Sequence, residues 1–312
     1  TGGLAANGSY SQQLSFTAPR DMEGTWYVFV LTDPALANQQ EKRGVVFELN
    51  AENNNAATAA QPLVIDVPPP ADLVVSQVNL PSQLAVGGSV TIDYTVTNAS
   101  DNPAYGSWTD AIYLSKDGQW DMADILLGKV DHIGDVLGQA SYTGQLTANV
   151  PPLKEGTWRV IVRPDLYNQV FEGQIRYTET GLNLPPAEAN NRTASANVLQ
   201  ITVPSLTVGS PLATTLKAGQ EQLYKVSVAA GETLRVFLDS SASAGANEIY
   251  IRYGDVPTLY AYDAAYDNPV AADQQAFIPS TQAGDYYVLV RSREDKTVTN
   301  PPAIPVSLRA DL

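Results

Sequence analysis

The sequence contains no cysteine, one histidine and two methionines. Without cysteine the chain forms no disulfide, has no thiolate nucleophile and holds no cysteine-ligated zinc. The one histidine, His132, is predicted in a short loop, and no serine stands in a nucleophile-elbow motif, so no catalytic triad or histidine-rich zinc site is predicted. The 33 acidic residues would allow a carboxylate pair for glycoside hydrolysis, but no spacing selects one. We therefore predict no catalytic residues and no enzymatic activity.

Basic residues are also scarce, because 18 lysines and arginines stand against 33 acidic residues, for a formal charge of −15 and a pI of about 4.3. Nucleic acids and anionic lipids bind basic surfaces, so we exclude both as partners. No apolar run approaches the roughly 18 residues that span a membrane, so membrane insertion of this chain is not predicted. The acidity favours solubility, and it also supplies oxygen ligands for hard cations such as calcium.

One long stretch of the sequence occurs twice. SYSQQL at 9–14 corresponds to SYTGQL at 141–146, EGTWYVFVLTD at 23–33 to EGTWRVIVRPD at 155–165, and PLVIDVP at 62–68 to VLQITVP at 198–204. Trp26 and Trp158 are 132 positions apart, whereas Glu52 and Glu188 are 136 apart, so four residues are inserted between these landmarks. A repeat of this length has the size of a domain, beyond the short periods of a solenoid.

Apolar residues alternate with period two in nearly every patterned segment, and none keeps the helical period for three turns. The clearest strand is predicted at 89–98, and others at 111–114 and 125–127. After residue 204 the predicted strands are 223–228, 249–253, 276–279, 286–290 and 305–308, with Leu234, Val236 and Leu238 on one face of another. We predict an all-β protein with immunoglobulin-like β-sandwich repeats and a C-terminal jelly-roll-type β-sandwich.

The repeat predicts three domains. Residues 69–204 form a complete immunoglobulin-like repeat, and residues 205–312 form the jelly-roll domain. Residues 1–68 correspond only to the second half of a repeat, because residue 1 aligns with residue 133. Half a sandwich exposes its core and strand edges, so we expect residues 1–68 to be truncated or to be completed by another chain.

Short motifs distributed through residues 71–204 resemble the CARDB family, a cell-adhesion-related domain found in bacteria. They are Ala71-Asp72-Leu73, Val96-Thr97-Asn98, residues 108–110, 113–117 and 124–128, Gly156-Thr157-Trp158, Asp165, Asn168, Glu172 and the group Glu188, Asn190 and Asn191. Residues 1–68 match only the second half of this pattern.

Residues 206–312 resemble the bacterial pre-peptidase C-terminal (PPC) domain. The motifs are residues 224–228, Ala230-Gly231-Glu232, residues 248–254, Val256-Pro257-Thr258, Tyr262-Asp263 and residues 283–290. The family usually has Asp-Leu-Tyr where this chain has Glu248-Ile249-Tyr250. Both resemblances imply non-catalytic accessory modules of large exported bacterial proteins.

The strongest candidate for a metal site is an acidic loop with Asp117, Asp121 and Asp124, together with Asp110 upstream. Carboxylates at i, i+4 and i+7 around Gly118 could converge on calcium, which takes six to eight oxygen ligands. The spacing is not that of an EF-hand. The alternative is a polar turn in which these side chains accept hydrogen bonds from backbone N–H groups.

A second acidic set consists of Asp165, Glu172 and Glu188, with Asn168, Asn190 and Asn191 beside them in the motif; Asp33, Glu52, Asn54 and Asn55 repeat part of it. Either a cation site or a buried hydrogen-bond network that ties the last loop to the sheet explains this recurrence.

A third candidate is a ligand-binding face of the PPC-like domain, formed by Tyr250, Tyr253, Tyr260 and Tyr262, for a glycan or an extended polypeptide. The alternative is that these tyrosines are core and rim residues.

These observations together predict a non-catalytic fragment of an exported bacterial protein at the cell surface or in the extracellular matrix. Its expected role is that of a stalk and adhesion module, with calcium as its one candidate cofactor. Its expected partners are other domains of the same protein, an extracellular glycan or protein, or neighbouring subunits. Two alternatives stay open, namely a targeting or substrate-binding appendage of a secreted protease or glycosidase, and a subunit of a self-assembling filament.

Overall fold

The computed structural model describes residues 3–18, 22–34, 45–46, 48–49, 54–173, 176–178, 181–183, 185–242, 245–293 and 302–312. It divides into two compact units, one of residues 1–70 and 173–185, the other of residues 71–172 and 186–312. The division into three domains stays a prediction. The all-β fold class is confirmed, because every described element is a β-strand except one helix of a single turn, α1 (Pro186–Ala189).

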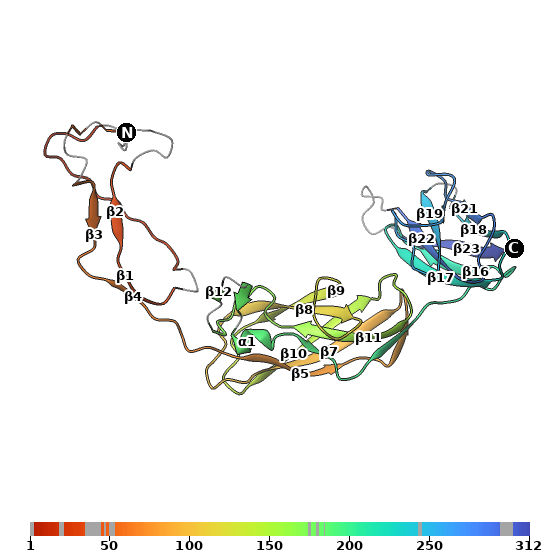
Figure 1. Ribbon diagram of the computed structural model, residues 1–312, viewed down its shortest axis with the longest axis horizontal. Coiled ribbons are helices and arrows are strands. Elements are labelled where there is room, and N and C mark those ends of the chain that lie inside the picture. Colours follow the sequence, from red (N-terminus) through yellow and green to blue (C-terminus); the bar gives the residue numbers. More distant parts are fainter. Residues whose placement is uncertain are drawn as a thin grey trace. The chain divides into compact units, whose positions relative to one another are not determined.

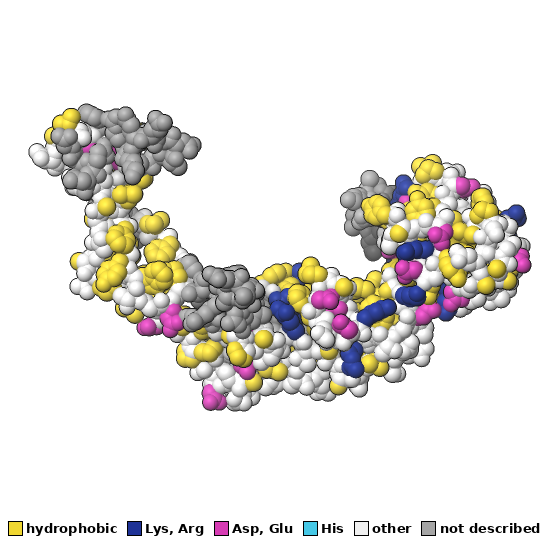
Figure 2. All heavy atoms as spheres, viewed as in Figure 1, with side chains coloured by type: hydrophobic (Ala, Val, Ile, Leu, Met, Phe, Trp, Pro, Cys, Tyr) yellow, Lys and Arg dark blue, Asp and Glu magenta, His cyan; other side chains and the backbone are white. Residues whose placement is uncertain are grey.

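The first unit contains short antiparallel ribbons (Figure 1). In the first, Gly24 pairs with Ile65 and Trp26 with Leu63, and in the second Phe29 pairs with Thr58. Every residue of β1, β2 and β3 is exposed, and Figure 2 shows hydrophobic side chains in the open along these ribbons. The strands are β1 (Gly24–Trp26), β2 (Phe29–Leu31), β3 (Ala56–Thr58), β4 (Leu63–Ile65), and a separate pair, β12 (Arg176–Thr178) and β13 (Gly181–Asn183).

The complete repeat is a sandwich of two sheets. The first has the strand order β10-β7-β5, and the second has the order β6-β15-β11-β8-β9, with β14 paired to β11. The strands are β5 (Leu73–Asn79), β6 (Gln83–Ala85), β7 (Ser89–Asn98), β8 (Ser107–Ser115), β9 (Ile125–Ile133), β10 (Ser141–Asn149), β11 (Gly156–Arg163), β14 (Thr193–Ala194) and β15 (Leu199–Thr202).

The core of this sandwich follows directly from the period of its strands. Strand β7 has the predicted bounds, and its Val90, Ile92, Tyr94 and Val96 are buried. Facing strands of the other sheet contribute alternate residues in the same way, and Trp108 is the largest fully buried side chain. A one-residue shift of register would turn such a strand's core residues toward water, which is why the pattern determines the facing.

Two strands of the repeat are longer than predicted. Strand β8 begins at Ser107 and therefore includes Trp108, and β9 continues to Ile133. The loop predicted for His132 is thus wrong, because His132 pairs with Trp108 in the antiparallel β8–β9 ladder. The His132 ring centroid lies 4.2 Å from that of Trp108 and 4.1 Å from that of Tyr142. Backbone pairing with β8 extends β9 to Ile133, through residues in which apolar and polar side chains do not alternate clearly.

The C-terminal sandwich also has two antiparallel sheets, with the orders β16-β23-β18-β21 and β17-β22-β19-β20. Leu234, Val236 and Leu238 are fully buried between them, as their alternation predicts. The strands are β16 (Leu212–Leu216), β17 (Glu221–Val228), β18 (Leu234–Ser240), β19 (Asn247–Tyr253), β20 (Ala264–Ala265), β21 (Gln274–Ile278), β22 (Gly284–Ser292) and β23 (Ile304–Asp311).

Candidate functional site

The acidic loop between β8 and β9 uses its carboxylates for its own backbone. Asp117 Oδ1 accepts the Gln119 N–H at 2.8 Å, and Asp121 Oδ1 accepts the Ala123 N–H at 2.7 Å. Asp124 Oδ2 accepts the Asp121 N–H at 3.0 Å. Each bond spans two or three residues, which is the geometry of polar turns. Gly118 has a φ of 78°, a backbone conformation that favours glycine.

Asp110, which the sequence grouped with this loop, lies instead in the core of the sandwich and is fully buried. Its Oδ2 accepts the Tyr94 and Tyr142 hydroxyls, both at 2.8 Å, and its Oδ1 accepts the Asp165 N–H at 3.2 Å. Burial raises the pKa of Asp110 to about 6, although the two tyrosine hydrogen bonds act to lower it. The chain folds this carboxylate into a closed network because β7, β8 and β10 all direct polar side chains to this point.

Three further carboxylates, Asp165, Glu172 and Glu188, are buried near one end of the same sandwich. The Asp165 oxygens accept the backbone N–H groups of Gln169 and Val170, each at 2.7 Å. Burial, together with repulsion from the neighbouring carboxylates, raises the pKa of Glu172 to about 8 and that of Glu188 to about 7. The sequence therefore identified a group whose members do lie close enough to interact.

Hydrogen bonds from this group connect distant parts of the repeat. Glu172 accepts the backbone N–H of Leu73, at the start of β5, and the Asn191 side-chain amide. The Asn190 side-chain amide donates to Asp72 Oδ1 at 2.9 Å. These contacts tie the segment after α1 to the first strand of the sandwich. These contacts form a buried hydrogen-bond network, which is the alternative to a cation site for these residues.

Two arginines lie beside these carboxylates. The guanidinium carbons of Arg163 and Arg192 each lie 4.7 Å from the centroid of the Trp120 ring. Both positive charges act to lower the pKa of Glu188, against the effect of its burial. Burying a charged group costs less free energy when opposite charges lie near it, as Arg163 and Arg192 do near Glu188. The first repeat copy has Leu31 and Ala56 at the matching positions, so the arginine pair distinguishes the complete repeat.

A calcium site stays a prediction for both acidic groups. Within the described ranges, no three histidine or acidic side chains are arranged to hold a metal ion. Calcium would have to compete with backbone N–H groups for the oxygens of Asp117, Asp121 and Asp124. Of the matching group in the first repeat, Glu52 lies outside the described residues, and Asp33 accepts the N–H groups of Val45 and Val46 at 2.8 and 2.7 Å.

The four candidate tyrosines do not share one environment. Tyr250 is buried, and its hydroxyl donates to Glu248 Oε2 at 3.1 Å. Tyr253 donates to the Ala283 carbonyl at 2.9 Å, whereas Tyr260 is 94% exposed. The ring of Tyr262 lies 5.3 Å from that of Tyr250, centroid to centroid. Tyr250 is thus a core residue, and a binding face that includes Tyr260 and Tyr262 stays a prediction.

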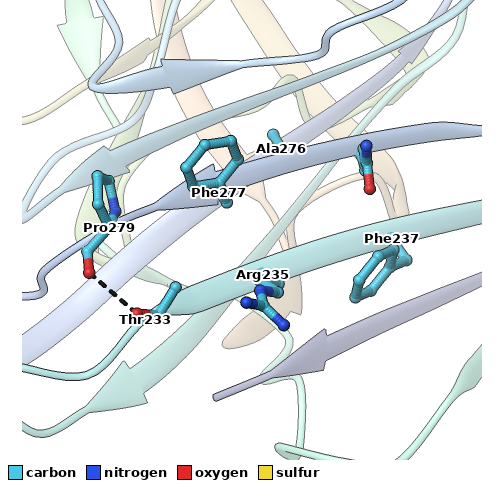
Figure 3. Close-up of a pocket in the computed structure, with 7 residues that line it drawn as sticks. Thr233, Arg235, Phe237, Ala276, Phe277 and Pro279 are labelled. Carbon is cyan, nitrogen blue, oxygen red and sulfur yellow. Dashed lines mark hydrogen bonds between the residues drawn. The ribbon is translucent and has the colours of Figure 1, made fainter.

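A concave site that is absent from the sequence predictions lies on the outer face of the sheet β16-β23-β18-β21. We call it the sheet-face groove, and it has two hollows. The first, of about 320 Å³, is lined by Thr233, Arg235, Phe237, Gln275, Ala276, Phe277 and Pro279. Figure 3 shows Arg235 and Phe237 along β18 and Phe277 along the neighbouring β21, with Pro279 just past the end of β21. The Thr233 hydroxyl donates to the Pro279 carbonyl at 3.0 Å and joins the strands at one end.

The second hollow continues the groove and is acidic. Its volume is about 580 Å³, and it shares Phe237 and Gln275 with the first hollow. The remaining lining residues are Asp239, Asp267, Asn268, Asp273 and Gln274. One sequence signal could have revealed the groove: between the buried Leu234, Val236 and Leu238, the outward positions of β18 include a phenylalanine where a solvated face ordinarily has a polar residue.

Residues 220–292 match the family described as bacterial pre-peptidase C-terminal domain. This match confirms the resemblance of the C-terminal sandwich to PPC domains. No curated protein matches the chain. Within the described residues no helix is long and apolar enough to cross a membrane.

The chain is similar to many solved structures, three of which are as follows. One is a CARDB domain from Pyrococcus furiosus in complex with di-metal ions (13% identity, TM-score 0.28, covering 42% of this chain and 89% of that one). Another is the PPC domain of a Bacillus anthracis collagenase (13% identity, TM-score 0.28, covering 35% and 94%). The third is the secreted serine protease VesC from Vibrio cholerae (14% identity, TM-score 0.27, covering 75% and 50%).

Proposed function

We propose that these 312 residues form a non-catalytic accessory region of an exported bacterial protein, which spaces neighbouring domains and attaches them to an extracellular polymer. The observation that carries the proposal is the family match of residues 220–292, because PPC domains recur as accessory modules of secreted bacterial proteins. The complete repeat supports the spacing role, since its buried core and connected carboxylate network make it a rigid unit. The sheet-face groove supports the attachment role, since it is concave and partly apolar.

The attachment role is tested with a fluorescent reporter fused to residues 1–312. The fusion is mixed with particles of gelatin, casein, cellulose or chitin, sedimented, and compared with the reporter alone. We expect retention of the fusion on at least one polymer. Sedimentation equal to that of the reporter alone on all four particles contradicts the proposal. Hydrolysis of any particle by the fusion contradicts its non-catalytic part.

A second candidate is that the region holds a secreted hydrolase near its substrate. It is favoured by the PPC match, since the family's description places the domain with peptidases. The sequence of the full reading frame separates the candidates: a protease or glycosidase domain beside these residues supports the appendage, and further adhesion repeats support the stalk.

A third candidate is assembly into a filament through residues 1–68. The observation that favours it is the exposure of apolar strands there, with Phe29 69% and Val30 58% exposed. Strands with an open edge and exposed apolar side chains are sites at which another chain can add. Size-exclusion chromatography with light scattering measures the mass of the particle in solution, and a monomer at micromolar concentration excludes this candidate.

A further inference from the structure

The sheet-face groove has a regular order of charge and apolar surface along β18. Arg235, Phe237 and Asp239 occupy alternate outward positions of this strand, and Arg235 and Asp239 are exposed. Alternate residues of a strand project from the same face, with a rise of about 3.3 Å per residue. The positive and negative groups are therefore anchored about 13 Å apart along the strand, with an aromatic ring between them.

The neighbouring strand β21 and the loop before it add further apolar and acidic side chains to the same groove. Phe277 stands opposite Arg235 in the antiparallel ladder and is 58% exposed, and Gln275 stands opposite Phe237. Asp267 and Asp273 line the acidic hollow together with Asp239. Strand β23 borders β18 on its other side, with Asp311 opposite Arg235 and Arg309 opposite Phe237. The apolar surface thus has Arg235 at one end, three carboxylates at the other, and Arg309 beside Phe237.

The end charges are available for a ligand. Among the described residues, neither Arg235 nor Asp239 has an ion pair or a side-chain hydrogen bond. The nearby Arg309, by contrast, pairs with Asp311 at 3.0 Å and lies 5.3 Å from the Phe237 ring centroid, so it stabilises the groove wall. Asp273 and Asp267 each accept one bond, from the Ser240 N–H and from the Gln275 side-chain amide, both at 2.7 Å. A carboxylate with one such bond retains acceptor capacity for a cation.

We propose that the sheet-face groove binds an extended polypeptide that presents an acidic, an apolar and a basic side chain at positions i, i+2 and i+4. An extended chain has the same two-residue period and nearly the same rise as β18, so its side chains meet Arg235, the two phenylalanines and the aspartates in turn. A neutral glycan would stack on the rings but would leave the charges at both ends unpaired. This inference rests on the proposed attachment role and names the class of polymer to which the region attaches.

The test uses residues 1–312 and fluorescence anisotropy with a labelled peptide containing Glu-Thr-Phe-Thr-Lys between glycines. We expect binding, and a loss on the order of fivefold when phenylalanine moves by one position, because that places it on the opposite face of the extended chain. Arg235→Glu should weaken binding of this peptide on the order of tenfold and strengthen binding of a Lys-Thr-Phe-Thr-Lys peptide. Lys217→Glu, an exposed site of the same sandwich with the same change in charge, should alter neither affinity.

Phe277→Ala supplies a second variant whose effect does not depend on charge. It should weaken binding of the parent peptide on the order of fivefold, whereas Tyr105→Ala, at a 63% exposed aromatic of the complete repeat, should have no effect. The inference is overturned if the peptide does not bind, if the original and shifted peptides bind equally, or if Arg235→Glu leaves the preference for the two charge patterns unchanged. It is also overturned if a neutral oligosaccharide displaces the peptide at a lower concentration than unlabelled peptide does.

The reporter assay distinguishes this inference from the proposed function. If the fusion with Arg235→Glu and Phe277→Ala is still retained on particles as well as the parent, the region attaches by another surface and the groove inference fails alone. If the parent fusion is not retained but the peptide binds as expected, the groove inference stands and the attachment role fails.

Discussion

Matching residues in the two copies of the repeat differ in burial: they are buried in the complete repeat and exposed in the first copy. Trp158 in the complete repeat is 6% exposed, and Trp26, its counterpart in the first copy, is 43% exposed. Val160 and Val162 are fully buried, whereas Val28 and Val30 are 40% and 58% exposed. The motif Gly-Thr-Trp followed by alternating valines therefore does not determine burial by itself.

Pairing of the β11 segment with the strands that follow it is nevertheless the same in both copies. Gly156 pairs with Ile201 as Gly24 pairs with Ile65, and Ile161 pairs with Ala194 as Phe29 pairs with Thr58. Asp165 and Asp33 even share a φ of 46°. Local sequence thus determines these ribbons and turns, including a left-handed residue that has a cost outside glycine.

The copies differ in what covers the ribbons. In the complete repeat β8 pairs with β11, so that Leu114 stands opposite Val160, and the sheet β10-β7-β5 closes the core. Among the described residues of 1–68, no strand occupies the position of β8. The difference teaches that the segment from β11 onward specifies strands and their register, and that the first half of the repeat buries them.

The largest expected effect comes from supplying the missing half. A variant with a second copy of residues 71–132 joined ahead of Thr1 should bury residues 24–31, because it provides partners equivalent to β7 and β8. Amide hydrogen exchange in that segment should slow on the order of 100-fold, measured by mass spectrometry. The control replaces the added 107–115 segment with glycine and serine. Unchanged exchange in the full graft would show that the two copies differ for another reason.

The next effect compares the two tryptophans directly. Trp158→Ala should lower the free energy of unfolding by about 3–5 kcal/mol, because it leaves a cavity in a packed core. Trp26→Ala should cost less than about 1 kcal/mol, because its ring is already 43% exposed. Urea denaturation of both variants measures the difference. Equal costs would mean that residues 1–68 are packed in solution as tightly as the complete repeat.

A third, pH-dependent effect is confined to the buried carboxylates of the complete repeat. Burial raises the pKa of Glu172 to about 8, so between its ordinary value of 4.5 and 8 the folded state keeps a proton that the unfolded chain releases. Stability should therefore fall as pH rises through this window. Glu172→Gln, which keeps the shape without the charge, should flatten the dependence and be the more stable protein at pH 8. Parallel curves of melting temperature against pH for the two proteins would refute the assignment.

The smallest expected effect belongs to the acidic loop, which the first copy lacks. Asp121→Ala removes one bond to the Ala123 N–H in an exposed turn and should cost about 0.5–1 kcal/mol. Isothermal calorimetry of residues 1–312 with calcium tests the metal prediction separately. Heat from the parent that is lost in Asp121→Ala supports calcium at this loop, and the absence of heat from the parent ends that prediction.

The sequence predicted most of the scaffold, because period-two alternation and an internal repeat are local signals. The bounds of β7 and the buried face of β18 were predicted correctly for this reason. The candidate sites were harder to predict. The sequence groups Asp110 with an acidic loop that begins seven residues downstream, but two tyrosine hydroxyls from β7 and β10 hold it in the core. Such contacts across sheets leave no trace in the spacing of one segment.

By itself, then, the sequence determined the all-β class, the strand registers shared by the two copies and the turns that aspartates and glycines require, since each depends on neighbours a few residues away. Only the tertiary structure decided which copy buries its valines, which carboxylates interact, and that Arg235, Phe237 and Phe277 line one groove. Burial and site geometry depend on strands that meet across a sheet, and residues far apart in the chain supply them.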